Sequence, residues 1–538
     1  MATTTGITQG PDSTARTATA PTGTAGRPAG RPGPRPRGGR GPDGPTGVPG
    51  DPGAPPARLL DRAADRVARR LRALRRRYVD NLPARVRLLR GAVLLLTAAC
   101  AGILLAAGLS AAGTWDAVAG RHAPRTVSAA DLNLALNDMD AQAVNILLSN
   151  GDAGKGRLTE SYDKALQLYD EARESVSKEL RTLAVAAEGD ERAQRTVELL
   201  TQDFARYQEF VGRALENDTR AGGKAAAVDD YRTAYGLLTE RLLPESRDLV
   251  DANNTQFEDA YGAEREDLRT DTALLLGVGV ALLTVLVALQ WYLARRFHRV
   301  LNPGIVGATV CVLTALVLGA QALTTTSEEL RVARRDAFDS VVALSRARAI
   351  AYDANADESR YLLDKENRAV HEAAFLAKSQ SLYGVEGVST VGGYEPVLTE
   401  TWQAYGQDPA DKRFTGEFRR ELDNITFAGE RAAAERTVDA YLVYQRDDRT
   451  IRSLVAAGHE AEAVAFCISW DPGESNAHFG EWMAALDDVT GINRTAFAQA
   501  ASDGRGALAT TLPWAGLALL AAAALTVLGL RPRLSEFR

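Results

Sequence analysis

Four long apolar segments constrain this chain more than any other feature of its sequence. Each has the roughly 20 apolar residues that a helix needs to cross a bilayer, and irregular backbone is excluded from the lipid interior. The segments cover residues 91–113, 272–294, 304–323 and 512–530. The pattern predicts four transmembrane helices, with most of the remaining chain in two long segments between paired spans, 114–271 and 324–511.

The two long segments carry short stretches of matching sequence at corresponding places. Residues 138–148 (DMDAQAVNILL) align with 353–363 (DANADESRYLL) near the start of each segment. Near the end of each segment, Asn253–Phe257 aligns with Asn493–Phe497. Matches at a fixed distance from the spans indicate an internal duplication, in which one unit of span, long segment and span is written twice.

Charge is distributed unevenly along the chain. Each long segment holds about 31 acidic residues against about 20 basic ones. The regions 58–90, 295–303 and 531–538 are basic instead, and Lys and Arg near span ends stay on the cytoplasmic side. We therefore predict a cell-membrane protein with cytoplasmic N- and C-termini, a cytoplasmic loop at 295–303, a cytoplasmic tail at 531–538, and both long segments extracytoplasmic.

The N-terminal residues 1–57 are rich in Pro, Gly, Thr and Arg and nearly free of large apolar side chains. A segment of this composition cannot bury enough apolar surface to fold. We predict a disordered cytoplasmic tail. A solvated tail is preferred over contact with lipid or nucleic acid, and no nucleic-acid partner is expected.

Residues 58–90 differ, because apolar side chains recur there at helical spacing between arginines. The arginines are Arg62, Arg66, Arg69, Arg70, Arg76 and Arg77. The pattern predicts a basic amphipathic juxtamembrane helix. Such a helix can lie on the anionic lipid of the inner leaflet or form the docking surface for a cytoplasmic partner, and the two roles are compatible.

Both long segments are predicted to be all-α. In the first, Gly- and Asp-containing turn signals at 150–154, 188–190 and 217–223 separate four helical stretches, which fit an up-down-up-down bundle. Pro244 lies within the fourth stretch and should kink or break it.

The second long segment is less regular. Its first helix is expected to run from the third span to about Gln380. A Gly-rich loop at 383–393 follows, and further helices are interrupted at Asp408-Pro409 and at Asp471–Gly473.

A polar face is present at the corresponding place in both segments. Asp353, Asp357 and Arg360 share one helix face by their i, i+4, i+7 spacing, with Glu358 beside them. In the first segment, Asp138 and Gln142 have the same i, i+4 relation. These residues are candidates for binding a partner protein or the ammonium group of an amino acid, and the alternative is a solvated face.

No catalytic, cofactor or metal site is predicted. The histidines lack the pair spacing of a zinc helix, and phosphate-binding and nucleophile-elbow motifs are missing. The cytoplasmic parts are too short to hold a kinase or cyclase domain. We therefore expect a protein that is not an enzyme.

The paired layout over residues 58–538 resembles the four-helix sensor domains of bacterial chemoreceptors and sensor kinases. More narrowly, the two Asp-x-[Asp/Asn]-Ala stretches and the order of spans resemble the GlnX-type actinobacterial membrane proteins. This resemblance implies an amino-acid-sensing relay. In such a relay, an extracytoplasmic solute-binding lipoprotein reports ligand to the outer domains, and the signal passes to a cytoplasmic Ser/Thr kinase resembling PknG.

The functional hypothesis is therefore a multi-pass membrane receptor that passes an extracytoplasmic signal to a cytoplasmic partner. A homodimer is compatible with it, because sensor bundles of this kind often pair. Two alternatives stay open: a non-signalling membrane scaffold for a cell-envelope or division complex, and a transporter accessory subunit.

Overall fold

The structure is a computed structural model that describes residues 82–151, 156–297, 301–411 and 413–535. All of these lie in one compact unit, Leu74–Arg538. The predicted disordered tail, 1–57, and the part of the predicted basic helix before Leu82 lie outside the described residues.

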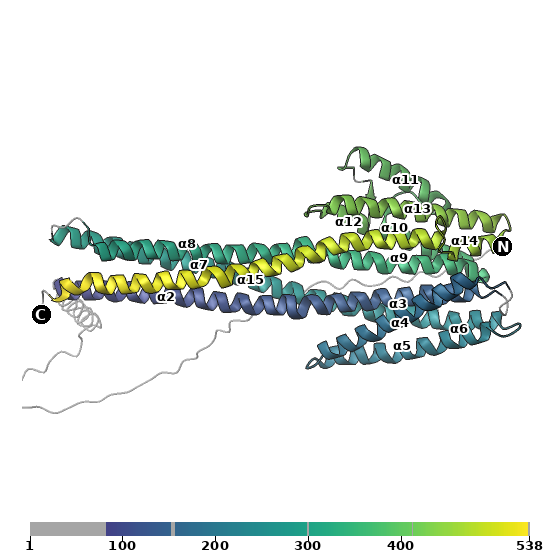
Figure 1. Cartoon of the computed structure of the whole chain (residues 1–538), viewed down its shortest axis with the longest axis horizontal. Coiled ribbons are helices and arrows are strands. Elements are labelled where there is room, and N and C mark those ends of the chain that lie inside the picture. Colours follow the sequence, from purple (N-terminus) through teal and green to yellow (C-terminus); the bar gives the residue numbers. More distant parts are fainter. Residues whose placement is uncertain (1–81, 152–155, 298–300, 412, 536–538) are drawn as a thin grey trace, which may run out of the picture. The chain divides into compact units, whose positions relative to one another are not determined.

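The predicted all-α fold with four transmembrane helices is confirmed. Four helical runs are long and apolar enough to cross a membrane. The helices that carry the apolar segments are α2 (Leu82–Ala117), α7 (Leu243–Phe297), α8 (Pro303–Arg331) and α15 (Ser475–Ser535). α2 packs on α7, α7 on α8, α8 on α15 and α15 on α2, which closes a four-helix bundle (Figure 1).

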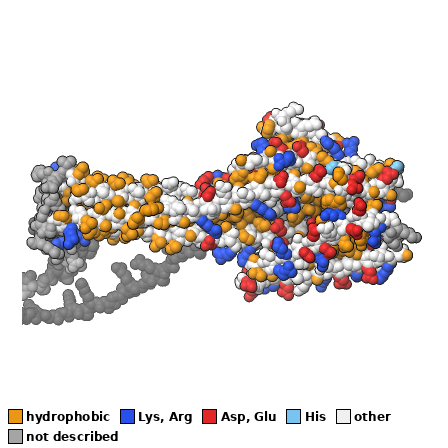
Figure 2. All heavy atoms as spheres, viewed as in Figure 1, with side chains coloured by type: hydrophobic (Ala, Val, Ile, Leu, Met, Phe, Trp, Pro, Cys, Tyr) orange, Lys and Arg blue, Asp and Glu red, His pale blue; other side chains and the backbone are white. Residues whose placement is uncertain are grey.

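The surface of this bundle is apolar, whereas charged side chains gather over the helices beyond it (Figure 2). Large apolar side chains such as Leu105, Val280, Val317 and Leu520 are more than half exposed on it. A surface of this kind is stable against lipid acyl chains and unfavourable in water. The four apolar helices therefore make this a membrane protein.

Glycines let the helices of the bundle approach closely at several places, two of which join α15 to α8 and to α2. The backbone of Gly304 in α8 lies so near Gly529 of α15 that an added Cβ would come within 2.7 Å of the Gly529 Cα. Toward the domains, the buried Trp115 ring of α2 lies against Gly504 of α15. Small residues are the usual means of close helix contact in membranes.

The first helical domain is built from four helical stretches, as predicted, and its helices end at the predicted turns. Its elements are α3 (Ala123–Ser149), α4 (Thr159–Ala186), α5 (Glu191–Asp218), α6 (Lys224–Leu237) and the first part of α7. The turns use left-handed backbone at Gly151, Gly189 and Gly222. Asp190 begins α5 by accepting hydrogen bonds from the backbone N–H groups of Arg192 and Ala193.

Pro244 was predicted to kink or break its helix, and the structure shows that it does not break it. A π-helical turn, η2 (Leu238–Leu242), joins α6 to α7 just before it. Pro lacks the backbone N–H that an α-helix needs at that position. The wider turn re-spaces the backbone hydrogen bonds there, so the chain stays helical through Pro244.

The second domain is formed by shorter elements. They are α9 (Asp339–Leu363), η4 (Lys365–Asn367), α10 (Arg368–Leu382), β1 (Gly384–Val385), α11 (Val391–Gln407), β2 (Phe414–Thr415), α12 (Glu417–Asp423), α13 (Glu430–Ala456), α14 (Glu460–Ile468) and the first part of α15. The predicted loop and both predicted interruptions separate these helices. β1 and β2 form a two-residue antiparallel pair that the sequence did not predict.

The predicted helix to Gln380 is interrupted at Asp364, which has non-helical backbone angles. The Asp364 carboxylate is held by Arg232 of the first domain, whose Nε and Nη2 donate to it at 3.1 and 2.6 Å. It also accepts a hydrogen bond from Asn367. A short polar side chain that bonds nearby groups competes with the regular helix, and here it ends α9.

The duplication is visible in the geometry. Alignment of residue 138 with 353 carries the π-helical turn η1 (Val118–His122) onto 333–337, inside the π-helical turn η3 (Val332–Phe338). Both turns join an apolar helix to a domain helix. The aligned residues Phe257 and Phe497 both contact Phe338, with ring centroids 4.8 and 5.5 Å apart.

Candidate functional site

The matched stretches of the two domains pack against each other. Residues 138–148 lie on α3 and residues 353–363 lie on α9, and these two helices form the largest part of the contact between the domains. The hydroxyl of Ser359 donates to the Asn145 side-chain oxygen at 2.7 Å across this contact. The repeat therefore buries its own two copies against each other.

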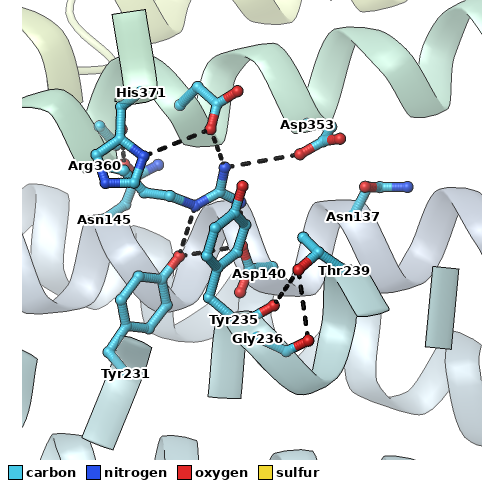
Figure 3. Close-up of polar contacts among 12 residues, drawn as sticks. Asn137, Asp140, Asn145, Tyr231, Tyr235, Gly236, Thr239, Asp353, Arg360 and His371 are labelled. Carbon is cyan, nitrogen blue, oxygen red and sulfur yellow. Dashed lines mark hydrogen bonds and ion pairs between the residues drawn. The ribbon is translucent and has the colours of Figure 1, made fainter. Parts of the chain in front are cut away.

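Arg360 is the centre of this contact. Its guanidinium forms ion pairs with Asp140 of α3 and with Asp357 of its own helix, and its Nε donates to the Tyr231 hydroxyl at 3.0 Å. Its side chain is 1 % exposed and that of Asp140 is not exposed. Figure 3 shows the guanidinium extending from α9 between Tyr231, Tyr235 and Asp140 of the first domain.

Two tyrosines complete the shell of Asp140. The hydroxyls of Tyr207 and Tyr231 donate to its two oxygens at 2.8 and 3.0 Å. Burial raises the pKa of both tyrosines well above the ordinary value, so both remain neutral donors. The Tyr235 ring lies 4.0 Å from the Arg360 guanidinium carbon, a cation–π contact (Figure 3). The buried charges are thus paired and hydrogen-bonded, as burial requires.

The predicted polar face on α9 is buried and not solvated. Lys378 of α10 lies 2.7 Å from the Asp353 carboxylate and also pairs with Asp357. Burial raises the pKa of Asp353, but the nearby charges of Lys378 and Arg360 outweigh it, and the net pKa is below the ordinary value. The ammonium group that faces these carboxylates is therefore that of Lys378, a residue of this chain, and not that of a bound amino acid.

The other candidates on these helices lie apart from the Arg360 cluster. Glu358 is buried in the second domain, where the Tyr444 hydroxyl is 3.4 Å away, and burial followed by the charge of Asp448 raises its pKa. Asp138 accepts a hydrogen bond from Gln142 at 2.9 Å, and burial raises its pKa to about 6.

A second ionic contact joins the domains beside this cluster. Arg232 of α6 binds Asp364 through two hydrogen bonds and also pairs with Glu366 at 2.7 Å. The His371 Nε2 is 3.3 Å from the same Asp364 carboxylate. Burial lowers the pKa of His371, which favours its neutral form near pH 7.

A cavity of about 550 Å³ lies next to the Arg360 cluster, between the two domains. Helices α3, α6 and α7 of the first domain and α9 and α10 of the second line it. Asp353 and Lys378 contribute to its wall, so the buried ion network is continuous with the cavity. Its volume is in the range of small-molecule sites.

The remaining predicted candidates, Arg62, Arg66, Arg69, Arg70, Arg76 and Arg77, lie outside the described residues. Within the part of the chain that the structure does describe, no group of three or more His, Cys, Asp or Glu side chains is arranged to hold a metal ion.

Fold and site together define an all-α membrane protein in which two helical domains meet through a buried ionic contact. Residues 114–262, which contain the first domain, match the family model of the actinobacterial sensor domain. No curated protein and no solved structure matches the chain. The four apolar helices make this a membrane protein, and its first domain is similar to the actinobacterial sensor domain.

Sequence reasoning missed several members of the site. Asp140 lies inside the repeat stretch 138–148, but nothing marked it as the partner of Arg360. Tyr231, Lys378 and Asp364 had no local signal, because each acts through residues on another helix.

Proposed function

We propose that this protein is a multi-pass receptor that passes an extracytoplasmic signal through its transmembrane helices to a cytoplasmic partner. The signal is an amino acid or a solute-binding lipoprotein that carries one, and the partner is a Ser/Thr kinase. The scaffold and transporter-accessory alternatives have no such dependence on an outer ligand.

The observation that carries the proposal is the continuity between apolar and domain helices. Each of the four helical runs, Ala84–Ser149, Lys224–Arg295, Pro303–Leu363 and Ser475–Pro532, contains an apolar membrane segment and a domain segment without interruption. A displacement of a domain helix is therefore transmitted directly to a span. Packed helices slide by about 1–2 Å between discrete arrangements, which is enough for such a relay.

The contact between the domains gives the relay its control point. α3 and α9 lie at the ends of the first and third of these runs, and Arg360–Asp140 joins them. A signal that binds one arrangement of the two domains better than another shifts the equilibrium between them. The π-helical turns η1 and η3, at equivalent places between span and domain, supply local adjustment of helix register.

We assign the orientation in the membrane from charge. The basic regions 58–90, 295–303 and 531–538 are assigned to the cytoplasm and both domains to the outside. Periplasmic-type reporters fused after Gly223 and Gly393 are expected to be active, and a reporter after Arg538 silent. An active reporter at Arg538 contradicts the orientation.

The relay is tested by affinity purification of the full chain from its own membranes, with and without amino acids outside the cells. Recovery of a Ser/Thr kinase in an amount that depends on the added amino acid supports the proposal. The matched control is Arg195→Met, an exposed arginine of α5, which should leave the dependence on amino acids unchanged. Failure to recover any kinase, or recovery that no amino acid changes in the wild type, contradicts it and favours the scaffold.

A further inference from the structure

The cavity between the domains has an unequal set of charges at its wall and mouth. Arg247, Arg346 and Lys378 contribute three cations, while Asp251 and Asp353 contribute two anions. Both anions already have partners. Asp353 is paired with Lys378 at 2.7 Å and with Arg360, and Asp251 lies 3.4 Å from Arg346.

Arg247 is the cation left over. It lies on α7 at the exposed edge of the cavity, and it makes no hydrogen bond or ion pair with any residue that the structure describes. Its charge contributes to the lowered pKa of Asp353, so the guanidinium acts on the inner wall of the cavity. Arginine presents a planar fork of donors that matches a carboxylate.

The rest of the lining is mainly apolar. Leu243, Val250, Val342 and Ile350 form walls from both domains, and the Ser345 hydroxyl adds a polar group. A pocket of this composition favours a ligand with an apolar body and one charged end.

We propose that this cavity binds a small organic carboxylate, with its carboxylate on Arg247 and its apolar body between the two domains. Because α7 and α9 both line the cavity, the bound molecule contacts both halves of the protein. The inference rests on the proposed function only in taking the cavity as the place where a signal enters.

The same geometry predicts which end of an amino acid is recognised. The carboxylates of the cavity that would attract a ligand ammonium group, Asp353 and Asp251, are already paired with Lys378 and Arg346. A carboxylate without an amino group therefore has every contact that the cavity offers, and the amine alone has none.

The test uses the purified full chain in lipid nanodiscs and isothermal titration with probes that share one carbon skeleton. Isovalerate carries the anion alone, valine carries both charges, and isobutylamine carries the cation alone. Acetate, phenylacetate and inorganic phosphate extend the series. We expect isovalerate or phenylacetate to bind at millimolar concentrations or below, and isobutylamine not to bind.

Arg247→Gln should weaken carboxylate binding about 10- to 100-fold, the range for the loss of a hydrogen bond to a charged group. Arg269→Gln, an exposed arginine on the same helix that does not line the cavity, is the matched control and should leave affinity unchanged. Valine that binds as well as isovalerate, and is equally weakened in Arg247→Gln, supports the inference and identifies amino acids as the source of the carboxylate.

Absence of binding by every carboxylate, tighter binding of phosphate or isobutylamine than of isovalerate, or an Arg247→Gln affinity equal to that of the wild type would overturn the inference. Binding is read without any kinase, so its failure is distinguishable from a failure of the relay.

Discussion

The Arg360 guanidinium of the second domain forms a buried ion pair with the Asp140 carboxylate of the first, across 220 residues of sequence. The two side chains lie on the aligned stretches of an internal repeat. In the first copy the position aligned with Arg360 is Asn145, and in the second copy the position aligned with Asp140 is Asn355. Divergence of the copies has thus placed opposite charges where the two helices meet.

Removal of one member of this pair should be strongly destabilising. Arg360→Met leaves Asp140 buried with only the two tyrosine donors, and loss of one partner of a buried pair costs about 3–5 kcal/mol in the free energy of unfolding. Thermal unfolding of the full chain in nanodiscs measures the effect. Arg195→Met, which removes an exposed i, i+4 pair with Glu191, should cost less than ~0.5 kcal/mol. Equal effects of the two substitutions would contradict the assigned role.

The sequence could predict the helices but not this contact. Spans and turn positions follow from local signals, such as apolar runs and Gly- or Asp-containing turns. Asp353, Asp357 and Arg360 at helical spacing look like a solvated face, because charged residues are rarely fully buried unless they are paired. Only the position of Asp140 and Lys378 on other helices shows that pairing is satisfied. The continuity of the helix through Pro244 could not be predicted for a related reason, since the π-helical turn before it has no sequence mark.

Asp364 should stabilise the fold most at neutral pH. Burial raises its pKa, but hydrogen bonds from Arg232, Asn367 and His371 outweigh burial and hold the pKa well below the ordinary 3.8. A carboxyl group with a lowered folded-state pKa contributes stability above the unfolded value, and that contribution is lost as the pH falls below it. Asp364→Asn should therefore lower the melting temperature near pH 7, and the difference should shrink only below about pH 3.8. A difference that is constant down to strongly acidic pH would contradict this.

Asp138→Asn should raise the melting temperature near pH 7, in contrast to Asp364→Asn. Burial raises the pKa of Asp138 from 3.8 to about 6, despite the hydrogen bond from Gln142 and the charge of Arg348. Above pH 6 the fold holds an ionised carboxylate that it disfavours, at a cost of up to about 3 kcal/mol. The neutral amide removes this cost and still accepts the Gln142 hydrogen bond. The gain in melting temperature should be absent near pH 4, grow up to pH 6 and stay level above it. A gain independent of pH would show that ionisation is not its cause.

Packing between the first and fourth apolar helices should depend on Gly504 and not on Gly506. A Cβ at Gly504 would lie 2.3 Å from the Trp115 ring, whereas one at Gly506, half a turn further along α15, would meet no atom within 4 Å. Trp115 is 1 % exposed, so its ring is packed by neighbouring groups. Overpacking of this kind costs about 1–3 kcal/mol, so Gly504→Ala should lower the melting temperature in nanodiscs. Gly506→Ala should leave it unchanged or raise it slightly, because Ala favours the helix over Gly. If both substitutions have the same effect, the Trp115–Gly504 contact does not hold these helices together.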